Sequence, residues 1–407
     1  MKKLHVLSLL ALGAAAVGGL VGCSGGSRAA DVTVGLICLH GDYSTYDKNF
    51  IDAMKAAQKN LGFKLVIKED VPEGTECYDT ASALVEQGCN IIFADSFGHE
   101  AHMIKAAKEN KNVLFCHATG TNGANENLAN FGDAFASIYE GRYLAGVAGG
   151  LKLAEKYGNG DGSKVSAADA KIGYVGAYTY AEVMSGYTSF FLGVQSVVPA
   201  ATMQVKFTGS WYDETKEKAI ANELIAGGAK LISQHADSHG APSACEAQKV
   251  FNVSYNGSTL EDGPSTYLIS SKINWQPYYE HVILNFKKAK DEGKAPTVEN
   301  DWVGTLKNGA VEIDAASKNC AAGTQDKLNE IKAKLENGTL HVFDTSKFTV
   351  GGQAPTEDSV RPGAATWAGL GEDVKFLTGG YYHESEFRSA PSFDVEIDGI
   401  TLLNRVY

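Results

Sequence analysis

The order of apolar and polar positions after residue 30 predicts alternating strands and helices. Short runs that are apolar throughout are separated by longer stretches in which apolar residues recur every three or four positions. Uniformly apolar strands are typical of parallel sheets that helices cover on both faces. The pattern therefore predicts an open parallel α/β sheet. We expect its strands at 31–39, 63–67, 90–94 and 112–116 and its helices at 47–61, 78–87 and 100–109.

The same alternation begins again after residue 170 and predicts a second sheet. The segment "LVEQGCNIIFADS" (84–96) resembles "LIAGGAKLISQHADS" (224–238), since both contain a helix end, a glycine, an apolar strand and then Asp-Ser. Because the two copies are a whole domain apart, we interpret the chain as two similar lobes rather than a solenoid. The expected strands are 171–175, 203–208, 230–234 and 251–255, and the expected helices are 181–197 and 215–225.

The remaining segments connect or extend these lobes. A glycine-rich helix is expected at 138–153, and a strand-like run followed by a helix at 277–290 is expected to return to the first lobe. Periodicity is weaker after residue 300, with one helix at 324–336 and several short strands. We therefore predict an N-terminal lobe of residues 31–136 and 266–300 and a C-terminal lobe of residues 137–265 and 301–407.

The first residues of the chain predict export and lipid anchoring. Lys2 and Lys3 precede an apolar stretch, 7–20, of the length of a signal-peptide core, which is short for a membrane span. "LVGC" (20–23) then has the form of a lipobox, in which Cys23 becomes the acylated N-terminus. We predict a signal peptide at 1–22, a lipid-anchored tether at 23–30 and a protein held at the extracytoplasmic face of the cell membrane. "GCSGG" also fits a serine hydrolase pattern, but it lies in no strand–turn–helix context.

Charge and cysteine content narrow the possible partners. Removal of residues 1–22 takes away two lysines and no acid, which lowers the net charge from -12 to -14. Nucleic-acid binding needs basic patches, so we expect no nucleic-acid partner. Cys77 and Cys89 flank one predicted helix, whose twelve residues span about 18 Å. The two cysteines are therefore too far apart for a disulfide. We expect most of the six cysteines after Cys23 to be buried thiols.

Polar and aromatic residues recur where the predicted strands end. The first strand runs into "CLHGDYSTYDKNF" (38–50), and similar side chains follow later strands. In open parallel sheets, ligands bind beyond the carboxyl ends of the strands. Aromatic faces stack on flat rings, and carboxylates accept hydrogen bonds from ring N–H groups or sugar hydroxyls. The candidate ligand-binding residues at these strand ends are Asp42, Phe97, His117, Tyr178, Trp211, Asp237 and Asn256.

Signatures of enzymes are missing from the sequence. It has no P-loop, no G-x-G-x-x-G after the first strand and no H-E-x-x-H, so we expect neither catalysis nor a cofactor. His99 and His102 lie on one helix face, and His40, His117 and His235 lie at strand ends. A metal-capturing protein is therefore an alternative, although a solvated helix face would equally explain His99 and His102.

Several segments together resemble the basic membrane protein family of substrate-binding lipoproteins for ABC importers, which includes bacterial purine nucleoside receptors. The resemblance covers nearly the whole chain after the lipobox. It rests on "GDYSTYD" (41–47), "IYEGRYLAG" (138–146), "TGSWYDETKEKAIANELIAGGA" (208–229), "QHADS" (234–238), "SYN" (254–256) and "INWQPYY" (273–279).

The resemblance implies a type I periplasmic-binding fold, with two Rossmann-like lobes joined by three hinge crossings. It implies that Tyr46 and Trp211 stack on a base, with Asp47 as a neighbouring polar contact. Asp237 and Asn256 would bind the ring or its sugar, and Trp275 would close the cleft. The family's Phe-Asn pair is Tyr-Asp here, and its lysine aligns nearer Ile273, with Lys272 one place off, so a free base stays possible beside a nucleoside.

The sequence thus predicts a monomeric, non-catalytic lipoprotein that captures a purine nucleoside or nucleobase for an ABC permease. The alternatives are a binding protein for another small polar ligand, such as a sugar or a metal ion, and a surface sensor or adhesin without a transport role.

Overall fold

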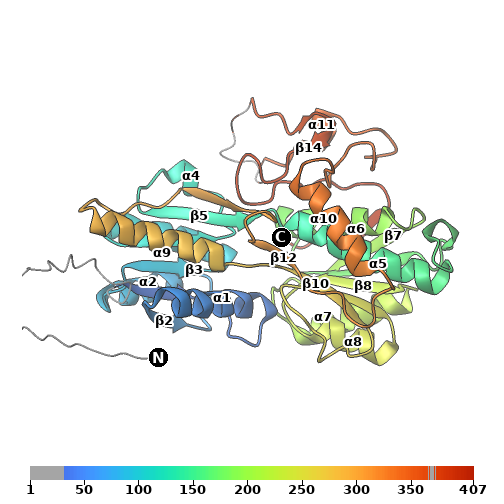
Figure 1. Ribbon diagram of the computed structural model, residues 1–407, viewed down its shortest axis with the longest axis horizontal. Helices are drawn as coiled ribbons and strands as arrows, with labels where there is room; N and C mark the ends of the chain where they lie inside the picture. The colour runs from blue at the N-terminus through green and yellow to red at the C-terminus, as the bar shows by residue number, and fades with distance from the viewer. Residues whose placement is uncertain (1–31, 365, 367–370, 372) are drawn as a thin grey trace, which may run out of the picture.

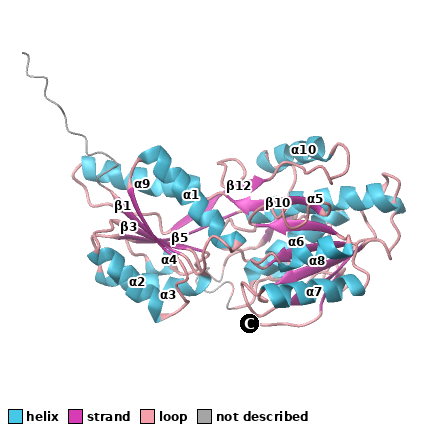
Figure 2. Cartoon of the chain, turned by 90° about the horizontal axis from the view of Figure 1, so that it is seen from below, coloured by secondary structure: helices cyan, strands magenta, loops and turns pink. Residues whose placement is uncertain are grey.

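The computed structural model describes residues 32–364, 366, 371 and 373–407. The expected signal peptide, lipobox and tether, with Cys23, lie outside these residues. Two lobes lie side by side along the long axis of the molecule, each with a central sheet between helices (Figures 1 and 2). This arrangement confirms the predicted α/β class with parallel sheets.

The N-terminal lobe is built on a six-stranded sheet in the order β11-β5-β4-β3-β1-β2, in which every neighbouring pair is parallel. Helices α1 (Thr45–Leu61) and α9 (Gln276–Asp291) cover one face, and α2 (Thr75–Glu86) and α3 (Glu100–Glu109) cover the other (Figure 2). The strands are β1 (Thr33–Ile37), β2 (Lys64–Lys68), β3 (Ile91–Ala94), β4 (Leu114–Ala118), β5 (Phe131–Ala136) and β11 (Asp301–Gly304).

The C-terminal lobe has a seven-stranded sheet in the order β12-β10-β9-β8-β6-β7-β15, parallel except for the β10–β12 pair. Helices α5 (Ile138–Tyr157) and α6 (Ala181–Gln195) pack on one face, and α7 (Glu214–Ala226) and α8 (Gly240–Gln248) pack on the other. Its strands are β6 (Lys171–Gly176), β7 (Thr202–Phe207), β8 (Leu231–His235), β9 (Phe251–Tyr255), β10 (Tyr267–Ile273), β12 (Val311–Ile313) and β15 (Ile400–Leu402).

Shorter elements complete the chain. The longest of them, α10 (Thr324–Glu336), packs against α5. The others are the 3-10 turns η2 (Phe97–His99) and η3 (Gly162–Lys164), helices α4 (Gly123–Glu126) and α11 (Glu357–Val360), and the hairpin of β13 (Leu377–Thr378) and β14 (Tyr381–Tyr382). None of the helices described is both long and apolar enough to cross a membrane.

Local sequence explains the two helices that matter most for the site and the core. Helix α1 begins where the Ser44 side chain accepts the backbone N–H of Asp47, and it ends at Gly62 in the left-handed conformation (φ 74°). In the glycine-rich helix α5, a Cβ on Gly146 would lie 2.1 Å from a carbonyl oxygen of α6. Glycine therefore allows the backbones of α5 and α6 to approach closely.

The three crossings between lobes differ from the predicted boundaries. The chain leaves the N-terminal sheet after β5, returns to that lobe after β10 and leaves it finally after β11. Residues 267–273 therefore belong to the C-terminal sheet and residues 301–304 to the N-terminal sheet, opposite to the prediction. Hydrophobic periodicity does not show which sheet a strand joins, because buried parallel strands have the same apolar pattern in both sheets.

Among the longer elements, β5 and α8 were missed, and the inference about cysteines was confirmed. Strand β5 reads "FGDAFA", whose small and acidic residues interrupt the apolar run, and α8 contains Gly240 and Pro242 in its first turn. All six cysteines of the described residues are free thiols, and five are buried, as expected.

Candidate functional site

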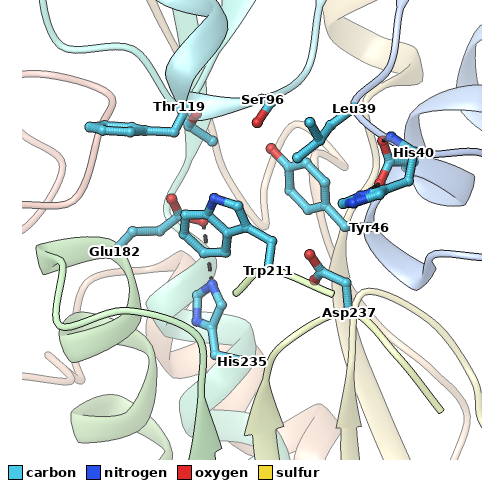
Figure 3. Close-up of a pocket in the computed structure, with 11 residues that line it drawn as sticks. Leu39, His40, Tyr46, Ser96, Thr119, Glu182, Trp211, His235 and Asp237 are labelled. Carbon is cyan, nitrogen blue, oxygen red and sulfur yellow. Dashed lines mark hydrogen bonds and ion pairs between the residues drawn. The ribbon is translucent and has the colours of Figure 1, made fainter. Parts of the chain in front are cut away.

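A cavity lies between the lobes where the carboxyl ends of both sheets meet, as Figure 3 shows. The N-terminal lobe contributes residues from the β1–α1 connection and from the loops after β3 and β4. The C-terminal lobe contributes the start of α6, the loop after β7 and the end of β8. The lining residues are Leu39, His40, Tyr46, Asp47, Ser96, Phe97, Thr119, Glu182, Trp211, His235 and Asp237.

Tyr46 and Trp211 form aromatic walls on opposite lobes (Figure 3). The Tyr46 hydroxyl donates to the backbone carbonyl of Asp95 at 2.6 Å, and its ring packs on Phe50 at 4.8 Å. The ring of Trp211 is backed by Tyr178, edge-on at 5.1 Å. Each of the two rings is therefore fixed in orientation by contacts with residues of its own lobe.

Asp237 supplies a carboxyl group between these walls. Its backbone N–H donates to the carbonyl of Trp211, and its carbonyl accepts the N–H of Thr45 from the other lobe at 3.0 Å. Burial, followed by the charge of Asp47, raises the pKa of the Asp237 carboxyl well above its usual range. Asp237 is therefore favoured in its neutral form, in which it can donate one hydrogen bond as well as accept others.

Asp47 lines the cavity but is largely occupied by its own loop. Its carboxylate accepts the N–H of His40 at 2.7 Å and the hydroxyl of Ser44 at 2.6 Å. Burial raises the pKa of Asp47, yet hydrogen bonds from His40 and Ser44 outweigh it, so that the pKa is lowered. Asp47 thus fixes the shape of residues 40–47, the loop that leaves the first strand.

Glu182 was not predicted to line the cavity, and His235 was named only as a strand-end histidine of the metal-capturing alternative. The His235 Nε2 lies 3.4 Å from a Glu182 carboxylate oxygen, and its ring packs on Tyr255 at 4.6 Å (Figure 3). Burial lowers the pKa of His235, which favours the neutral ring. His235 directly follows the predicted strand 230–234, which is the position that identified it, whereas Glu182 reaches the cavity from the first turn of α6 and has no strand-end signal.

The lobes are drawn together in this structure. Thr45 donates through both its N–H and its hydroxyl to the carbonyl of Asp237, which joins α1 to the C-terminal lobe. The enclosed space is about 20 Å³, roughly enough for one water molecule. A flat ring can therefore enter only when the lobes part at their crossings, as hinged domains do.

Five predicted residues lie outside this lining. Asp42 is exposed on the loop surface, Tyr178 lies behind Trp211, and Asn256 supports Asp237 through a hydrogen bond. Trp275 is 1% exposed and stacks on Phe50 at 4.4 Å, so it belongs to the core and does not close the cleft. The indole of Trp275 instead supports Tyr46 through Phe50.

His117 also belongs to a buried network and not to the cavity wall. Its Nδ1 lies 3.1 Å from the Asp133 carboxylate, and its Nε2 lies 2.7 Å from the carbonyl of Ser96. Glu100, in the same cluster, accepts the N–H groups of Thr121 and Asn122. This cluster and the group of Cys38, Asp47 and Asp95 have spacings that could hold a metal ion, but their polar atoms are mostly engaged in hydrogen bonds within the fold.

Of the two histidines named for the metal-capturing alternative, His99 does not lie on a solvated face, whereas His102 on α3 is half-buried. His99 is fully buried, and its Nε2 lies 3.0 Å from the carbonyl of Val71. Burial lowers its pKa to about 4. A buried, neutral His99 that joins η2 to the β2–α2 connection is a structural residue.

The His117–Asp133 pair predicts a pH-dependent stability. Burial raises the pKa of Asp133 to about 7, and the hydrogen bond with Asp133 raises that of His117 despite burial. In the unfolded chain these groups titrate near about 3.9 and about 6.5. The folded protein therefore binds more protons, and its free energy of unfolding is expected to fall as pH rises through about 7.

Urea unfolding at several pH values between 5 and 8.5 measures this slope. Asp133→Asn should make it shallower, because asparagine does not titrate and His117 loses its carboxylate, while Asp52→Asn on the exposed face of α1 should leave it unchanged. An Asp133→Asn slope equal to that of the wild-type protein would contradict the assignment.

Comparison with known proteins places the chain among substrate-binding proteins of ABC transporters. The family model Bmp, described as "ABC transporter substrate-binding protein PnrA-like", matches residues 40–346. The chain belongs to this family. Bmp proteins are the extracytoplasmic substrate-binding components of ABC transporters and are not enzymes, which confirms the predicted family and the coarser part of the predicted function.

Two relatives and one solved structure illustrate the relationship. The chain is 30% identical to a purine-binding protein of Brucella abortus, over 74% of this chain and 80% of the relative. It is 28% identical to a putative ABC transporter glucose-binding protein of Haloferax volcanii, over 64% of this chain and 60% of the relative. An ABC transporter solute-binding protein from Conexibacter woesei superposes with a TM-score of 0.61 at 18% identity, covering 76% of this chain and 98% of that one, which confirms the type I fold.

Proposed function

We propose that this Bmp-family protein captures a purine nucleoside or nucleobase in the cleft between its lobes and delivers it to the permease of an ABC importer. The observation that carries the proposal is the pair of aromatic walls, Tyr46 and Trp211, on opposite lobes. A flat ring that enters the opened cleft would be covered on both faces when the lobes close. Carboxyl groups of Glu182 and Asp237 at the edges of this space suit the ring N–H and exocyclic amino groups of a purine.

The lining also weighs against an anionic ligand in this part of the cleft. None of the residues that line it is Lys or Arg, and three of them are Asp or Glu. A phosphate or carboxylate would face the negative charge of Asp47 without a bidentate partner. A neutral heterocycle fits the lining better, and the purine-binding relative supports the same class.

A sugar is the second candidate ligand. The Haloferax relative is described as a putative glucose-binding protein, and carboxylates beside an aromatic face also suit sugar hydroxyls. Two aromatic walls suit either ring, and the purine is favoured because the purine-binding relative matches more of this chain at a higher identity than the putative glucose-binding relative does.

Isothermal titration calorimetry of the purified protein decides between these ligands. We expect binding of adenine, guanine or their nucleosides and no heat with glucose or Zn²⁺. Binding of glucose alone would identify a sugar as the ligand. Binding of Zn²⁺ alone would indicate a metal-capturing protein. Loss of purine uptake in cells that lack the protein would separate import from a sensor or adhesin.

We further propose that Cys23 is the lipid attachment site and that the protein acts as a monomer. Cys23→Ala removes the only thiol in the lipobox-like "LVGC". The variant is therefore expected to lose incorporation of labelled fatty acid and to leave the membrane fraction. Cys320→Ala, which removes a thiol of the folded region, is the matched control. Equal labelling of wild-type protein and Cys23→Ala would contradict the anchor.

A further inference from the structure

The N-terminal lobe carries opposite charges at its two ends. Its strands point their carboxyl ends at the cleft, so the second halves of its helices and the connections that follow them lie at the far end of the lobe. This far end consists of residues 53–64, 81–91, 105–114, 125–131 and 284–300. It contains ten lysines and six acidic residues, whereas the rest of the lobe contains two lysines and thirteen acidic residues. A lobe that is acidic overall therefore has a basic far end.

Helix geometry accounts for only part of this bias. A lysine in the last turn of a helix is stabilised by the helix dipole. Four lysines of the far end occupy such turns, which are Lys59, Lys108, Lys288 and Lys290. The other six lie earlier in the helices or in the connections, where the dipole offers little stabilisation. The concentration of lysines at this end is thus a property of the surface and not of the separate helices.

The lysines of α1 and α9 share one outer side of the lobe. These two helices lie next to each other on the same face of the sheet (Figures 1 and 2). Lys55, Lys59 and Lys288 are exposed, and the ion pairs among the described residues of the far end involve other lysines. Their charges are therefore available to a partner with negative charge.

An exposed apolar side chain lies among these lysines. Leu284 is 49% exposed on α9, and it precedes Lys288 by four residues, so that both lie on one face of the helix. A leucine flanked by lysines on an exposed helix face is typical of segments that rest in the headgroup region of a lipid bilayer. The composition of this face therefore favours a lipid surface over a purely polar partner.

The chain also enters the lobe at its far end. Val32, the first residue described, precedes β1, and its carbonyl accepts the N–H of Lys64 at 2.9 Å. The residues from Cys23 to the start of the described chain number nine, and nine extended residues reach about 30 Å at most. A chain acylated at Cys23 would hold the basic far end within that distance of the membrane.

We propose that the far end of the N-terminal lobe docks on an anionic lipid surface, with Lys55, Lys59 and Lys288 beside the headgroups and Leu284 among them. The acidic end of the lobe and the cleft then lie away from the lipid, since like charges repel. The inference goes beyond the proposed ligand and depends on the proposed anchor at Cys23 only for the closeness of the two surfaces.

Co-sedimentation with lipid vesicles tests the docking in the Cys23→Ala protein, which lacks acyl chains and so reports on the protein surface alone. The vesicles contain phosphatidylglycerol and phosphatidylcholine at about one to two, or phosphatidylcholine only. We expect binding to the anionic vesicles, which is lost at about 0.5 M NaCl, and no binding to the neutral ones.

A pair of matched variants in the same Cys23→Ala protein locates the surface. Lys59→Glu with Lys288→Glu should weaken binding to the anionic vesicles by about tenfold or more. Lys156→Glu with Lys218→Glu makes the same change in net charge at exposed lysines of α5 and α7 in the other lobe and should bind as the parent does. Equal weakening by both pairs would show a response to net charge alone and would overturn docking at the far end.

The orientation is measured on the acylated wild-type protein bound to the anionic vesicles. Amine labelling followed by mass spectrometry should be slower at Lys59 and Lys288 than on neutral vesicles and unchanged at Lys156 and Lys218. Equal labelling of Lys59 and Lys288 on both kinds of vesicle would contradict the orientation.

The remaining outcomes also decide the matter. If the Cys23→Ala protein does not bind anionic vesicles, docking is overturned whether or not the chain is acylated. Self-association without vesicles that the Lys59→Glu and Lys288→Glu pair abolishes would assign the face to a second copy of the chain. Purine calorimetry and fatty-acid labelling on the same proteins test the proposed function and the anchor separately, so each of the three can fail alone.

Discussion

Replacing Trp211 by alanine is expected to weaken purine binding by one to two decades. Base–aromatic stacking contributes about 1–3 kcal/mol for each aromatic face, and the variant loses one of the two walls. Tyr46→Ala should have a similar effect, because its ring forms the other wall. Calorimetric titration of both variants with the best-binding purine measures the change.

Melting of the ligand-free variants separates this role from a structural one. Tyr46 packs on Phe50 and donates to the carbonyl of Asp95, so Tyr46→Ala alone also removes support from α1. Tyr46→Phe is the matched control, since it keeps the aromatic face and loses only the hydroxyl. We expect Tyr46→Phe to bind nearly as well as the wild type. Near-wild-type affinity of both alanine variants would exclude the stacking arrangement.

Arg142→Met is expected to cost about 3–5 kcal/mol of the free energy of unfolding, the largest stability effect that we predict. Arg142 is fully buried in α5. Its guanidinium donates to the Tyr174 hydroxyl and the Ser233 hydroxyl at 2.9 Å each, and it lies 4.6 Å from the ring of Tyr255. Methionine fills part of the volume but leaves these buried acceptors on β6 and β8 without a donor.

Urea unfolding followed by circular dichroism measures this loss. Arg405→Met is the matched control, because Arg405 pairs with Glu396 at the surface and solvent screens that pair. We expect its midpoint to stay close to that of the wild type. A similar midpoint for Arg142→Met would mean that the hydrogen bonds of Arg142 do not support the C-terminal sheet.

The sequence allowed the fold and part of the cavity to be predicted, for identifiable reasons. Uniformly apolar strands and strand-end side chains are local signals, and they led directly to Trp211 and Asp237, which line the cavity. Tyr46 came from the family resemblance. Each of these residues immediately follows a strand or begins the next helix, so its place at the sheet edge follows from topology alone.

The remaining site residues depend on how distant segments pack. Glu182 reaches the cavity only because α6 begins at the sheet edge. Trp275 shows the converse, since the family resemblance implied a role in closing the cleft, whereas stacking on Phe50 buries it in the core. Hydrophobic patterns carry no information about such contacts between lobes.

The interleaved path of the chain between the lobes also constrains how the protein is made. Strand β5 ends at residue 136, but its sheet neighbour β11 begins only at residue 301, and α9, whose Tyr279 packs on Phe93 at 4.7 Å, is nearly as late. During synthesis the N-terminal sheet therefore remains incomplete, with a bare strand edge and an uncovered apolar face, until about three quarters of the chain has emerged. Closing so long a loop slows folding. A nascent chain of this topology is thus vulnerable to aggregation for most of its synthesis and is well suited to a chaperone that keeps it unfolded until about three quarters of it has emerged.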